Sequence, residues 1–337
     1  IEILSISLYV LAASNRKSLA SNEAGMKYFL MGAFMTGFLL LGITLLYGVS
    51  GSFDVIEIQT ALMSKTSSPL LMTGVVLLVI AMLFKASVAP FHFWAPDVYT
   101  GSPTLVTGFM STVAKVAAFG AMYKLFAVAL VPKIYEVEPL LIMFIILTFI
   151  IANFSALKQT SVKRILAFSG VSHAGFLLLA IVSSNFESAG NLFYYAAAYA
   201  IANVVAFTVV IYVSHVKEND HLESFKGLLY ARPGMAIALI ISILSMAGIP
   251  PLAGFIGKFL VLMATIQAQY TYVAIIAVIT SIVSIYYYFK IIIAMTHKVE
   301  DNSAFTCPPA IYTTIAWVGV ILLLILGFAP KYFVGLF

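Results

Sequence analysis

Long apolar segments separated by short polar loops run through the whole of this 337-residue chain. A helix that crosses the hydrocarbon core of a bilayer needs about 20 mostly apolar residues. By that measure the pattern predicts one partial and nine full passes, near residues 1–13 (partial), 25–49, 69–91, 104–131, 139–157, 164–183, 189–214, 233–268, 271–295 and 310–330. We therefore expect an all-α polytopic membrane protein with one transmembrane domain over residues 1–337. Since 1–13 resembles the interior of a helix, further N-terminal transmembrane helices are expected before residue 1.

Two of these segments are interrupted. The segment 233–268 is too long for one straight pass and contains Gly248-Ile249-Pro250-Pro251. The segment 69–91 likewise ends in a stretch, Lys85 to Pro96, that contains Pro90. Proline removes a backbone donor, and broken backbone at membrane depth is tolerated only beside protein or a water-filled cavity. Paired broken helices in two halves of a chain indicate a transport site. The spacing of the two breaks suggests two five-helix repeats in inverted topology, with 1–131 as the end of the first, 139–295 as the second and 310–337 as a C-terminal helix.

Composition agrees with a membrane protein and argues against a cofactor site. The chain is 62% hydrophobic and only 9% charged, whereas soluble domains carry roughly 25% charged residues. The single cysteine, Cys307, excludes a disulfide framework and a cysteine-ligated iron–sulfur cluster or zinc site within the chain. The five histidines lack metal-ligand spacing, and no Gly-rich nucleotide loop follows a strand signal. We expect no cofactor in this chain and no nucleic-acid partner.

The net charge of +5 is explained by the enrichment of lysine and arginine in the cytoplasmic loops of membrane proteins. The predicted loops of one side hold 11 such residues: Arg16, Lys17, Lys27, Lys158, Lys163, Arg164, Lys217, Lys226, Arg232, Lys290 and Lys298. The other side holds 4, namely Lys65, Lys124, Lys133 and Lys331. This asymmetry predicts that the first side is cytoplasmic and that the C-terminus at Phe337 faces the opposite side.

Three lysines, Lys85, Lys115 and Lys258, lie inside the long apolar segments. A charged lysine deep in a bilayer costs several kcal/mol, from about 2.5 upward. We interpret the three as parts of a polar path for protons or ions. The alternative for Lys85 is that its ammonium reaches the interface from a helix end. For the other two, the alternative is a structural bond to carbonyls of a neighbouring helix.

Glu2 and His173 are two further candidates for this path. Glu2 is the only acid within an apolar segment, and a buried glutamate beside buried lysines needs a counter-charge that a lysine can supply. His173 follows Ser169 and Ser172 in the cytoplasmic half of a predicted span, where these groups could conduct protons through water. A histidine that bonds a backbone carbonyl between helices is an equally good interpretation.

Other polar positions have simpler expected roles. Asp97, close to Trp94, is expected to cap a helix or to anchor the lipid interface. The run Tyr286-Tyr287-Tyr288 is expected to pack between helices or at the interface. The pair Lys163-Arg164 is expected to act mainly as a topology signal.

Several motifs resemble a known family, the antiporter-like membrane subunits of respiratory complex I. The most specific is Lys85-Ala-Ser-Val-Ala-Pro-Phe-His-Phe-Trp-Ala-Pro-Asp-Val-Tyr-Thr-Gly-Ser-Pro-Thr104, which is similar to the broken-helix motif of that family. The segments Val162-Lys-Arg-Ile-Leu-Ala-Phe-Ser169 and Gly248-Ile-Pro-Pro-Leu-Ala-Gly-Phe-Ile-Gly-Lys-Phe259 fit as well. The openings Glu2-Ile-Leu-Ser-Ile-Ser-Leu-Tyr-Val-Leu-Ala-Ala13 and Glu23-Ala-Gly-Met-Lys-Tyr-Phe-Leu-Met-Gly-Ala33 resemble most the subunit N branch of bacterial NADH-quinone oxidoreductases.

The resemblance implies a fourteen-helix fold in which helices 4–8 and 9–13 are inverted repeats, with roughly the first four helices absent from this chain. It also implies roles for individual residues. Glu2 would be the glutamate of the fifth helix, and Lys85, Lys115 and Lys258 would be the lysines of the seventh, eighth and twelfth helices.

The expected function is that of a proton-translocating subunit of a translocase, an NADH:quinone oxidoreductase in the bacterial inner membrane. The resemblance implies that NAD, FMN, iron–sulfur clusters and quinone bind to other subunits. The expected partners are the lipid bilayer and other membrane subunits of complex I, including neighbouring antiporter-like ones. Two alternatives stay open, a cation/proton antiporter subunit of a multi-subunit sodium/proton exchanger and a structural membrane scaffold.

Overall fold

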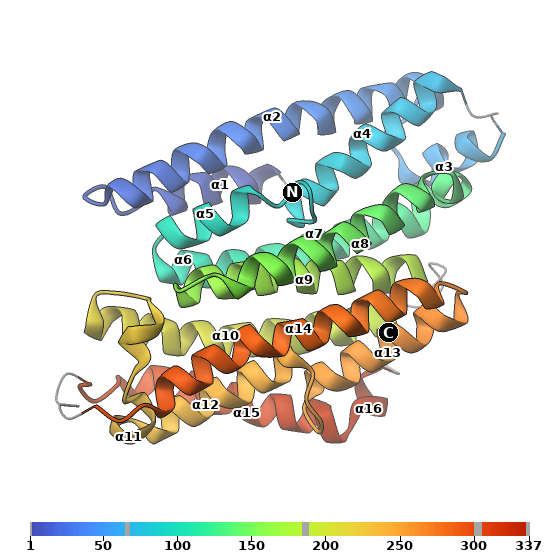
Figure 1. Cartoon of the computed structure of the whole chain (residues 1–337). Helices are drawn as coiled ribbons and strands as arrows, with labels where there is room; N and C mark the ends of the chain where they lie inside the picture. Colours follow the sequence, from blue (N-terminus) through green and yellow to red (C-terminus); the bar gives the residue numbers. More distant parts are fainter. Residues whose placement is uncertain (1, 65–67, 184–188, 300–304, 335–337) are drawn as a thin grey trace.

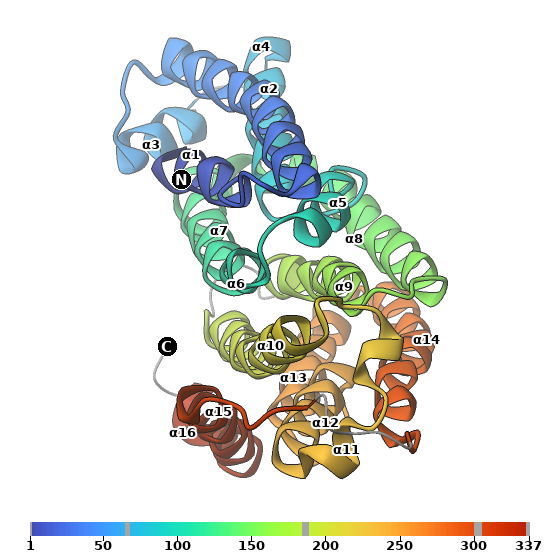
Figure 2. The same ribbon diagram turned by 90° about the vertical axis from the view of Figure 1, so that its left-hand side faces the viewer.

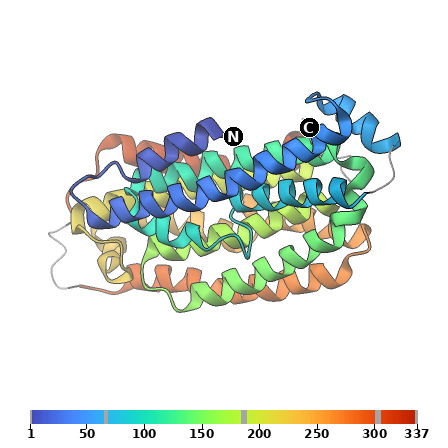
Figure 3. The same ribbon diagram turned by 90° about the horizontal axis from the view of Figure 1, so that it is seen from above.

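The computed structural model describes residues 2–64, 68–183, 189–299 and 305–334. Lys65 and Phe337, which were used in the orientation argument, lie outside the described residues. Nearly every described residue outside the short connections is helical, and the helices lie side by side along the length of the molecule (Figures 1 and 3). The predicted all-α polytopic fold is thereby confirmed.

Among the described residues, seven helical segments are long and apolar enough to cross a membrane. One of them is built from four consecutive pieces: α6 (Thr104–Phe109), the π-helical turn η1 (Met110–Ala114), α7 (Lys115–Lys124) and the π-helical turn η2 (Leu125–Ala129). Another joins a short 3₁₀ turn, η3 (Val131–Lys133), to α8. The long helices are α2 (Leu19–Ser50), α8 (Ile134–Leu157), α9 (Val162–Ser183), α10 (Gly190–Lys217), α14 (Thr271–Thr296) and α15 (Ala310–Phe328).

The two interrupted spans are pairs of shorter helices. The first consists of α4 (Pro69–Lys85) and α5 (Trp94–Gly101), and the second of α12 (Pro233–Ala247) and α13 (Ala253–Gln267). Together with the seven long segments they account for the nine full passes that the sequence predicts. In Figure 1 the first pair runs from right to left and the second from left to right, so the two broken helices have opposite directions.

The remaining helices are short: α1 (Glu2–Ala12), α3 (Val55–Ser64), α11 (Leu228–Ala231), α16 (Pro330–Val334) and the 3₁₀ turn η4 (Leu222–Phe225). Of these, α1 corresponds to the partial pass. The sequence pattern missed α3 and placed the end of the first broken span before α5. Both helices are far shorter than a bilayer is thick, so hydropathy over about 20 residues does not detect them.

Local signals account for where several helices begin and end. Ser18 caps α2, because its hydroxyl accepts from the Ser21 N–H, and Ser68 caps α4 in the same way, ahead of Pro69. At the breaks, the backbone turns at Ser87 (φ +55°) in the first and at Gly248 (φ +84°) in the second. This left-handed region suits glycine and is uncommon for serine. Each break also contains one cis peptide bond, Ala89–Pro90 and Pro250–Pro251.

Helix α9 lies at the centre of the bundle, between α5 and α8 on one side and α10, α13 and α14 on the other (Figure 2). Every residue of this helix except Arg164 is buried. The connections α8–α9 and α10–α12 and the C-terminal end of α14, which carry many of the lysines and arginines counted above, lie at one end of the bundle, on the left in Figure 1. That end is called the basic end below. Polar side chains in and around α9 are therefore shielded from lipid.

Candidate functional site

Glu2 and Lys85 form an ion pair near the first break. The distance from Lys85 Nζ to Glu2 Oε1 is 3.0 Å, and the lysine side chain is only 6% exposed. Lys85 also donates to Ser5 Oγ at 2.9 Å, and Thr36 on α2 donates to Glu2 Oε2 at 2.9 Å. Lys85 is the last residue of α4, which ends near mid-length of the bundle (Figure 1), and its ammonium contacts Glu2 and Ser5 of α1. A charge that costs several kcal/mol alone is thus paired and hydrogen-bonded.

A cavity of about 270 Å³ adjoins this pair. It is lined by Leu4, Ser5, Leu8, Tyr28, Lys85, Ala114, Ala117 and Ala118. A water molecule needs only about 10–15 Å³ of such volume together with polar partners. The cavity therefore has room for several waters beside Lys85. Its wall also includes Ala114, the residue before Lys115, so it extends to the start of α7.

Lys115 is buried and bonds to the central helix. Its residue is 2% exposed, and Nζ donates to the carbonyl oxygen of Gly170 on α9 at 2.7 Å. The absence of a side chain at Gly170 permits this approach, because a Cβ there would lie 3.2 Å from Lys115 Nζ and 3.0 Å from the hydroxyl of Tyr199.

Lys258 lies at the second break and is 8% exposed. Its Nζ donates to the carbonyl oxygen of Ala247, the last residue of α12, at 3.2 Å. Since the carbonyls at the end of a helix lack intrahelical partners and carry partial negative charge, a cation is stabilised there. The ammonium also lies 5.1 Å from the ring centroid of Phe176 on α9. A second cavity, of about 200 Å³, is lined by Lys258 and residues of α13 and α14.

Neither Lys115 nor Lys258 belongs to any ion pair that involves the described residues. The expected alternative, a structural bond to a neighbouring carbonyl, is present at both positions. Such a bond satisfies one of the three ammonium donors and leaves the positive charge uncompensated. A buried lysine in this state responds to any charge that approaches it, because the medium around it screens poorly.

His173 connects two tyrosines within the core. Its Nδ1 lies 2.6 Å from the hydroxyl of Tyr195, and its Nε2 lies 3.2 Å from the hydroxyl of Tyr288. Tyr288 in turn bonds Ser169. The histidine therefore pairs with side chains rather than with a backbone carbonyl. The chain Tyr195–His173–Tyr288–Ser169 is a continuous series of groups that can both donate and accept protons.

A second branch extends from Ser172 towards α8 and α14. Asn153 donates to Ser172 Oγ at 3.1 Å, and Tyr287 donates to Asn153 Oδ1 at 3.0 Å. The prediction that the tyrosine run only packs is therefore incomplete. Tyr286 is 62% exposed, while Tyr287 and Tyr288 are buried with their hydroxyls in the polar network. In the sequence, the only signal for this polar role was the general rule that a buried tyrosine hydroxyl needs a hydrogen-bond partner.

Three residues of α9 bring these groups together. Gly170 accepts from Lys115, His173 holds the two tyrosines, and Phe176 contacts Lys258. These positions are three residues apart, so they follow one another along one side of the helix. The structure thus brings Glu2 directly to Lys85, and it brings Lys115, His173 and Lys258 to a common helix.

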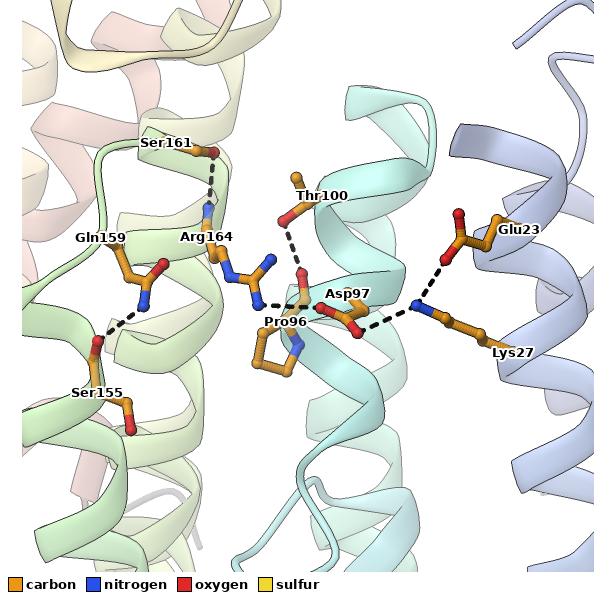
Figure 4. Close-up of polar contacts among 9 residues, drawn as sticks. All are labelled: Glu23, Lys27, Pro96, Asp97, Thr100, Ser155, Gln159, Ser161 and Arg164. Atoms are coloured by element: carbon orange, nitrogen blue, oxygen red, sulfur yellow. Dashed lines mark hydrogen bonds and ion pairs between the residues drawn. The ribbon is translucent and has the colours of Figure 1, made fainter. Parts of the chain in front are cut away.

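A cluster of charges at the basic end involves residues that the sequence analysis interpreted more simply (Figure 4). Asp97 on α5 contacts Lys27 of α2 at 3.3 Å and Arg164 of α9 at 3.0 Å, each through a different carboxylate oxygen. Lys27 also pairs with Glu23 at 2.7 Å. We call Glu23, Lys27, Asp97 and Arg164 the Asp97 cluster. Asp97 thus bridges helices, beyond the capping or interfacial role expected for it.

The described residues contain no group of three or more histidine, cysteine, aspartate or glutamate side chains that could hold a metal ion. Within that part of the chain, the chemistry of the site is carried by lysine, glutamate, histidine, tyrosine and serine. Groups of these types can donate and accept protons.

Comparisons with known proteins show the family to which the chain belongs. The family model described as NADH:quinone oxidoreductase/Mrp antiporter, TM, matches residues 1–284. The chain is 47% identical to the NADH-quinone oxidoreductase subunit N of Flavobacterium psychrophilum over 331 residues, which cover 98% of this chain and 72% of the relative. It is 45% identical to the subunit N of Cytophaga hutchinsonii, over 94% of this chain and 68% of that protein.

Solved structures give the same result. A chain of respiratory complex I from Thermus thermophilus with bound aureothin is 35% identical, with a TM-score of 0.84 over 99% of this chain and 73% of that one. A chain of the Mrp complex from Dietzia sp. is 20% identical, with a TM-score of 0.84 over 94% of this chain and 67% of that one, and it supports the fold alone. The chain therefore belongs to the NADH:quinone oxidoreductase/Mrp antiporter family of membrane proteins, within the branch of the subunit N proteins.

Proposed function

We propose that this chain is a proton-translocating membrane subunit of an NADH:quinone oxidoreductase. The observation that carries the proposal is the succession of ionisable groups along the bundle, from the Glu2–Lys85 pair to Lys115, His173 and Lys258, with cavities beside Lys85 and Lys258. Uncompensated buried lysines are costly and indicate a path for ions or protons. The subunit N relatives support the assignment to the redox-driven enzyme.

In the proposed mechanism, redox chemistry elsewhere in the complex changes the charge that faces the Glu2–Lys85 pair. When the pair separates, Lys85 loses its counter-charge, and a proton moves through water in the adjoining cavity towards Lys115. The His173 network lies on α9 between Gly170, which binds Lys115, and Phe176, which contacts Lys258, and we propose that the proton passes along this side of α9. From Lys258 the proton leaves through the cavity at the second break.

The setting of the subunit follows from this role. NAD, FMN, iron–sulfur clusters and quinone would bind to other subunits, and this chain would supply only the proton path. Its partners would be the other membrane subunits of complex I, including neighbouring antiporter-like ones. We place it in the bacterial inner membrane with the basic end in the cytoplasm and the C-terminus on the periplasmic side, as the lysine and arginine asymmetry predicts.

We further propose that residues 1–131 end a first inverted repeat, that 139–295 form a second and that 310–337 form a C-terminal helix. The opposite directions of the two broken helices support this division. Each break also brings a lysine, Lys85 or Lys258, to the end of a half-helix. A repeat that is inverted in the membrane places equivalent groups at similar depth.

A cation/proton antiporter subunit is the second candidate. The family description includes Mrp antiporters, and the Dietzia complex has the same fold. Sodium-dependent proton exchange without NADH oxidation would favour it. Proton pumping that survives the loss of every buried charge would instead favour a structural scaffold.

The function is tested by the substitution Lys85→Ala in the full complex. In membrane vesicles we expect a strong loss of NADH-driven proton pumping while the complex still assembles. The exposed lysine Lys226, which pairs with Glu223 at the basic end, provides the matched control, and Lys226→Ala should pump normally. An assembled Lys85→Ala complex with wild-type pumping would overturn the assignment.

A further inference from the structure

Helix α5 depends on its neighbours for its position. It has only 8 residues, and the break precedes it. An isolated helix of this length is unstable, because its few hydrogen bonds do not offset the free energy needed to form the first turn. Two consecutive residues of α9 hold its two ends: Arg164 bonds Asp97 in the first turn, and buried Lys163 donates to the carbonyl of Ser102, just after the last turn, at 3.0 Å. Lys27 supplies the contact to α2.

The members of the Asp97 cluster are 37–58% exposed at their side chains. Exposed ion pairs contribute only about 0–1 kcal/mol each to stability. The cluster is therefore a weak source of stability for a bundle of this size. Its geometry is the informative feature, because one carboxylate contacts a cation from each of two helices that flank α5. A cavity of about 270 Å³ at the cluster gives water access to it.

A direct line of contacts leads from the cluster to Lys85. Trp94 lies three residues before Asp97, and its ring stacks on Tyr28 with centroids 4.5 Å apart and planes 9° apart. The Trp94 Nε1–H donates to the carbonyl of Phe84, the residue before Lys85, at 3.1 Å. Tyr28, the neighbour of Lys27, lines the cavity beside Lys85. A shift of α5 against α2 would therefore alter both the end of α4 and the cavity wall.

We propose that Asp97 is a positioning residue for the proton relay: by contacting Lys27 and Arg164 it fixes α5 between α2 and α9, and so sets the surroundings of Lys85. The inference rests on the proposed function. In this arrangement, loss of the Asp97 charge frees α5 to shift, the Tyr28–Trp94 stack loosens, and the Glu2–Lys85 pair changes its geometry. The ion pairs of the Asp97 cluster are weak enough to rearrange, and through Trp94 and Tyr28 such a rearrangement would reach the surroundings of Lys85.

The test uses the complete complex in membrane vesicles with Cys307→Ser, which removes the single cysteine of this chain. Ala118→Cys then places one thiol in the wall of the cavity beside Lys85. We measure its labelling by a small water-soluble maleimide together with the protons pumped per NADH oxidised. Asp97→Asn should raise the labelling rate several-fold and lower the pumping ratio. Asp97→Glu, which keeps the charge, should restore both.

Two further variants complete the test. Lys27→Gln removes the contact to α2 and leaves Arg164 in place, so it should give smaller changes in the same directions even if Asp97→Asn assembles poorly. Glu223→Gln breaks an exposed pair at the same end and should change neither readout. Unchanged labelling in both cluster variants, or failure of Asp97→Glu to restore it, would overturn the positioning role. Absence of pumping in the wild-type complex would instead overturn the proposed function, and the labelling rate would still report on Asp97.

Discussion

The ion pair between Glu2 and Lys85 should appear as a coupling energy when the two charges are removed singly and together. Suitable neutral variants are Glu2→Gln and Lys85→Met. Opposite unit charges 3.0 Å apart attract each other by about 5 kcal/mol at an effective dielectric constant near 20. Desolvation offsets part of this attraction, and measured couplings between contacting residues are about 0.5–3 kcal/mol. We expect a coupling in the upper half of that range.

The two single variants should differ in cost, because the partners differ in exposure. The Lys85 side chain is 6% exposed and that of Glu2 is 29% exposed. Glu2→Gln therefore leaves a charged lysine with little access to water, and we expect a loss of about 3 kcal/mol, at the lower limit for a broken buried pair. Lys85→Met leaves a glutamate that water and Thr36 can still solvate, so its loss should be smaller.

The assay is unfolding of the full-length subunit in mixed lipid–detergent micelles, titrated with a denaturing detergent. The double variant should be less destabilised than the sum of the single variants, and it should remain inactive in proton pumping. Glu2→Gln combined with Lys226→Met provides a control, since Lys226 pairs with Glu223 instead, and this pair of changes should be additive. Additivity of Glu2→Gln and Lys85→Met within about 0.5 kcal/mol would refute the pair mechanism.

Three further predictions concern the core, the second break and the topology. Tyr288→Phe removes a hydroxyl that bonds two buried side chains, so it should slow pumping and destabilise the subunit by about 1–3 kcal/mol in the same assays. Gly254→Ala places a Cβ against the backbone oxygen of Ser245 in α12 and should destabilise the subunit by about 1–3 kcal/mol. Gly37→Ala, with open space around it, should not destabilise the subunit. A reporter fused within 217–232 should be cytoplasmic and one after Phe337 periplasmic, and two reporters on one side would contradict the orientation.

The transmembrane helices were predictable because burial in lipid demands long apolar runs, and the broken spans because proline and glycine interrupt such runs. The first and last residues of the helices were harder to predict. The predicted span 25–49 begins at Leu19 in the structure, since Ser21, Asn22 and Glu23 are polar yet helical. In the same way α8 begins at Ile134, ahead of the predicted 139, because Glu136 and Glu138 occupy its first turns. Hydropathy detects only the apolar part of a helix. These helices begin in polar residues, so they start earlier than the predicted spans.

The candidate site was predictable where a charge stands in an apolar run. Lys85, Lys115 and Lys258 stand out in this way. The pairing of Lys85 with Glu2, and the common contact of Lys115 and Lys258 with α9, required the tertiary structure. The hydroxyls of Tyr195 and Tyr288 gave no comparable signal, because tyrosine is common in apolar segments. Contacts between residues far apart in the sequence, such as Asp97 with Arg164, depend on how the helices pack and were not accessible from local pattern.

The π-helical turn η1, directly before Lys115, has a consequence for how that lysine is aimed. A π turn holds about one residue more than an α turn, and one residue corresponds to about 100° of rotation in an α-helix. If Met110–Ala114 adopted α-helical hydrogen bonding without a change of sequence, Lys115 would rotate by roughly that angle relative to α6 and leave the carbonyl of Gly170. Deleting Val113 would instead straighten the helix and keep the lysine facing α9. The direction of this ammonium thus depends on the hydrogen-bond register of the single turn that precedes it.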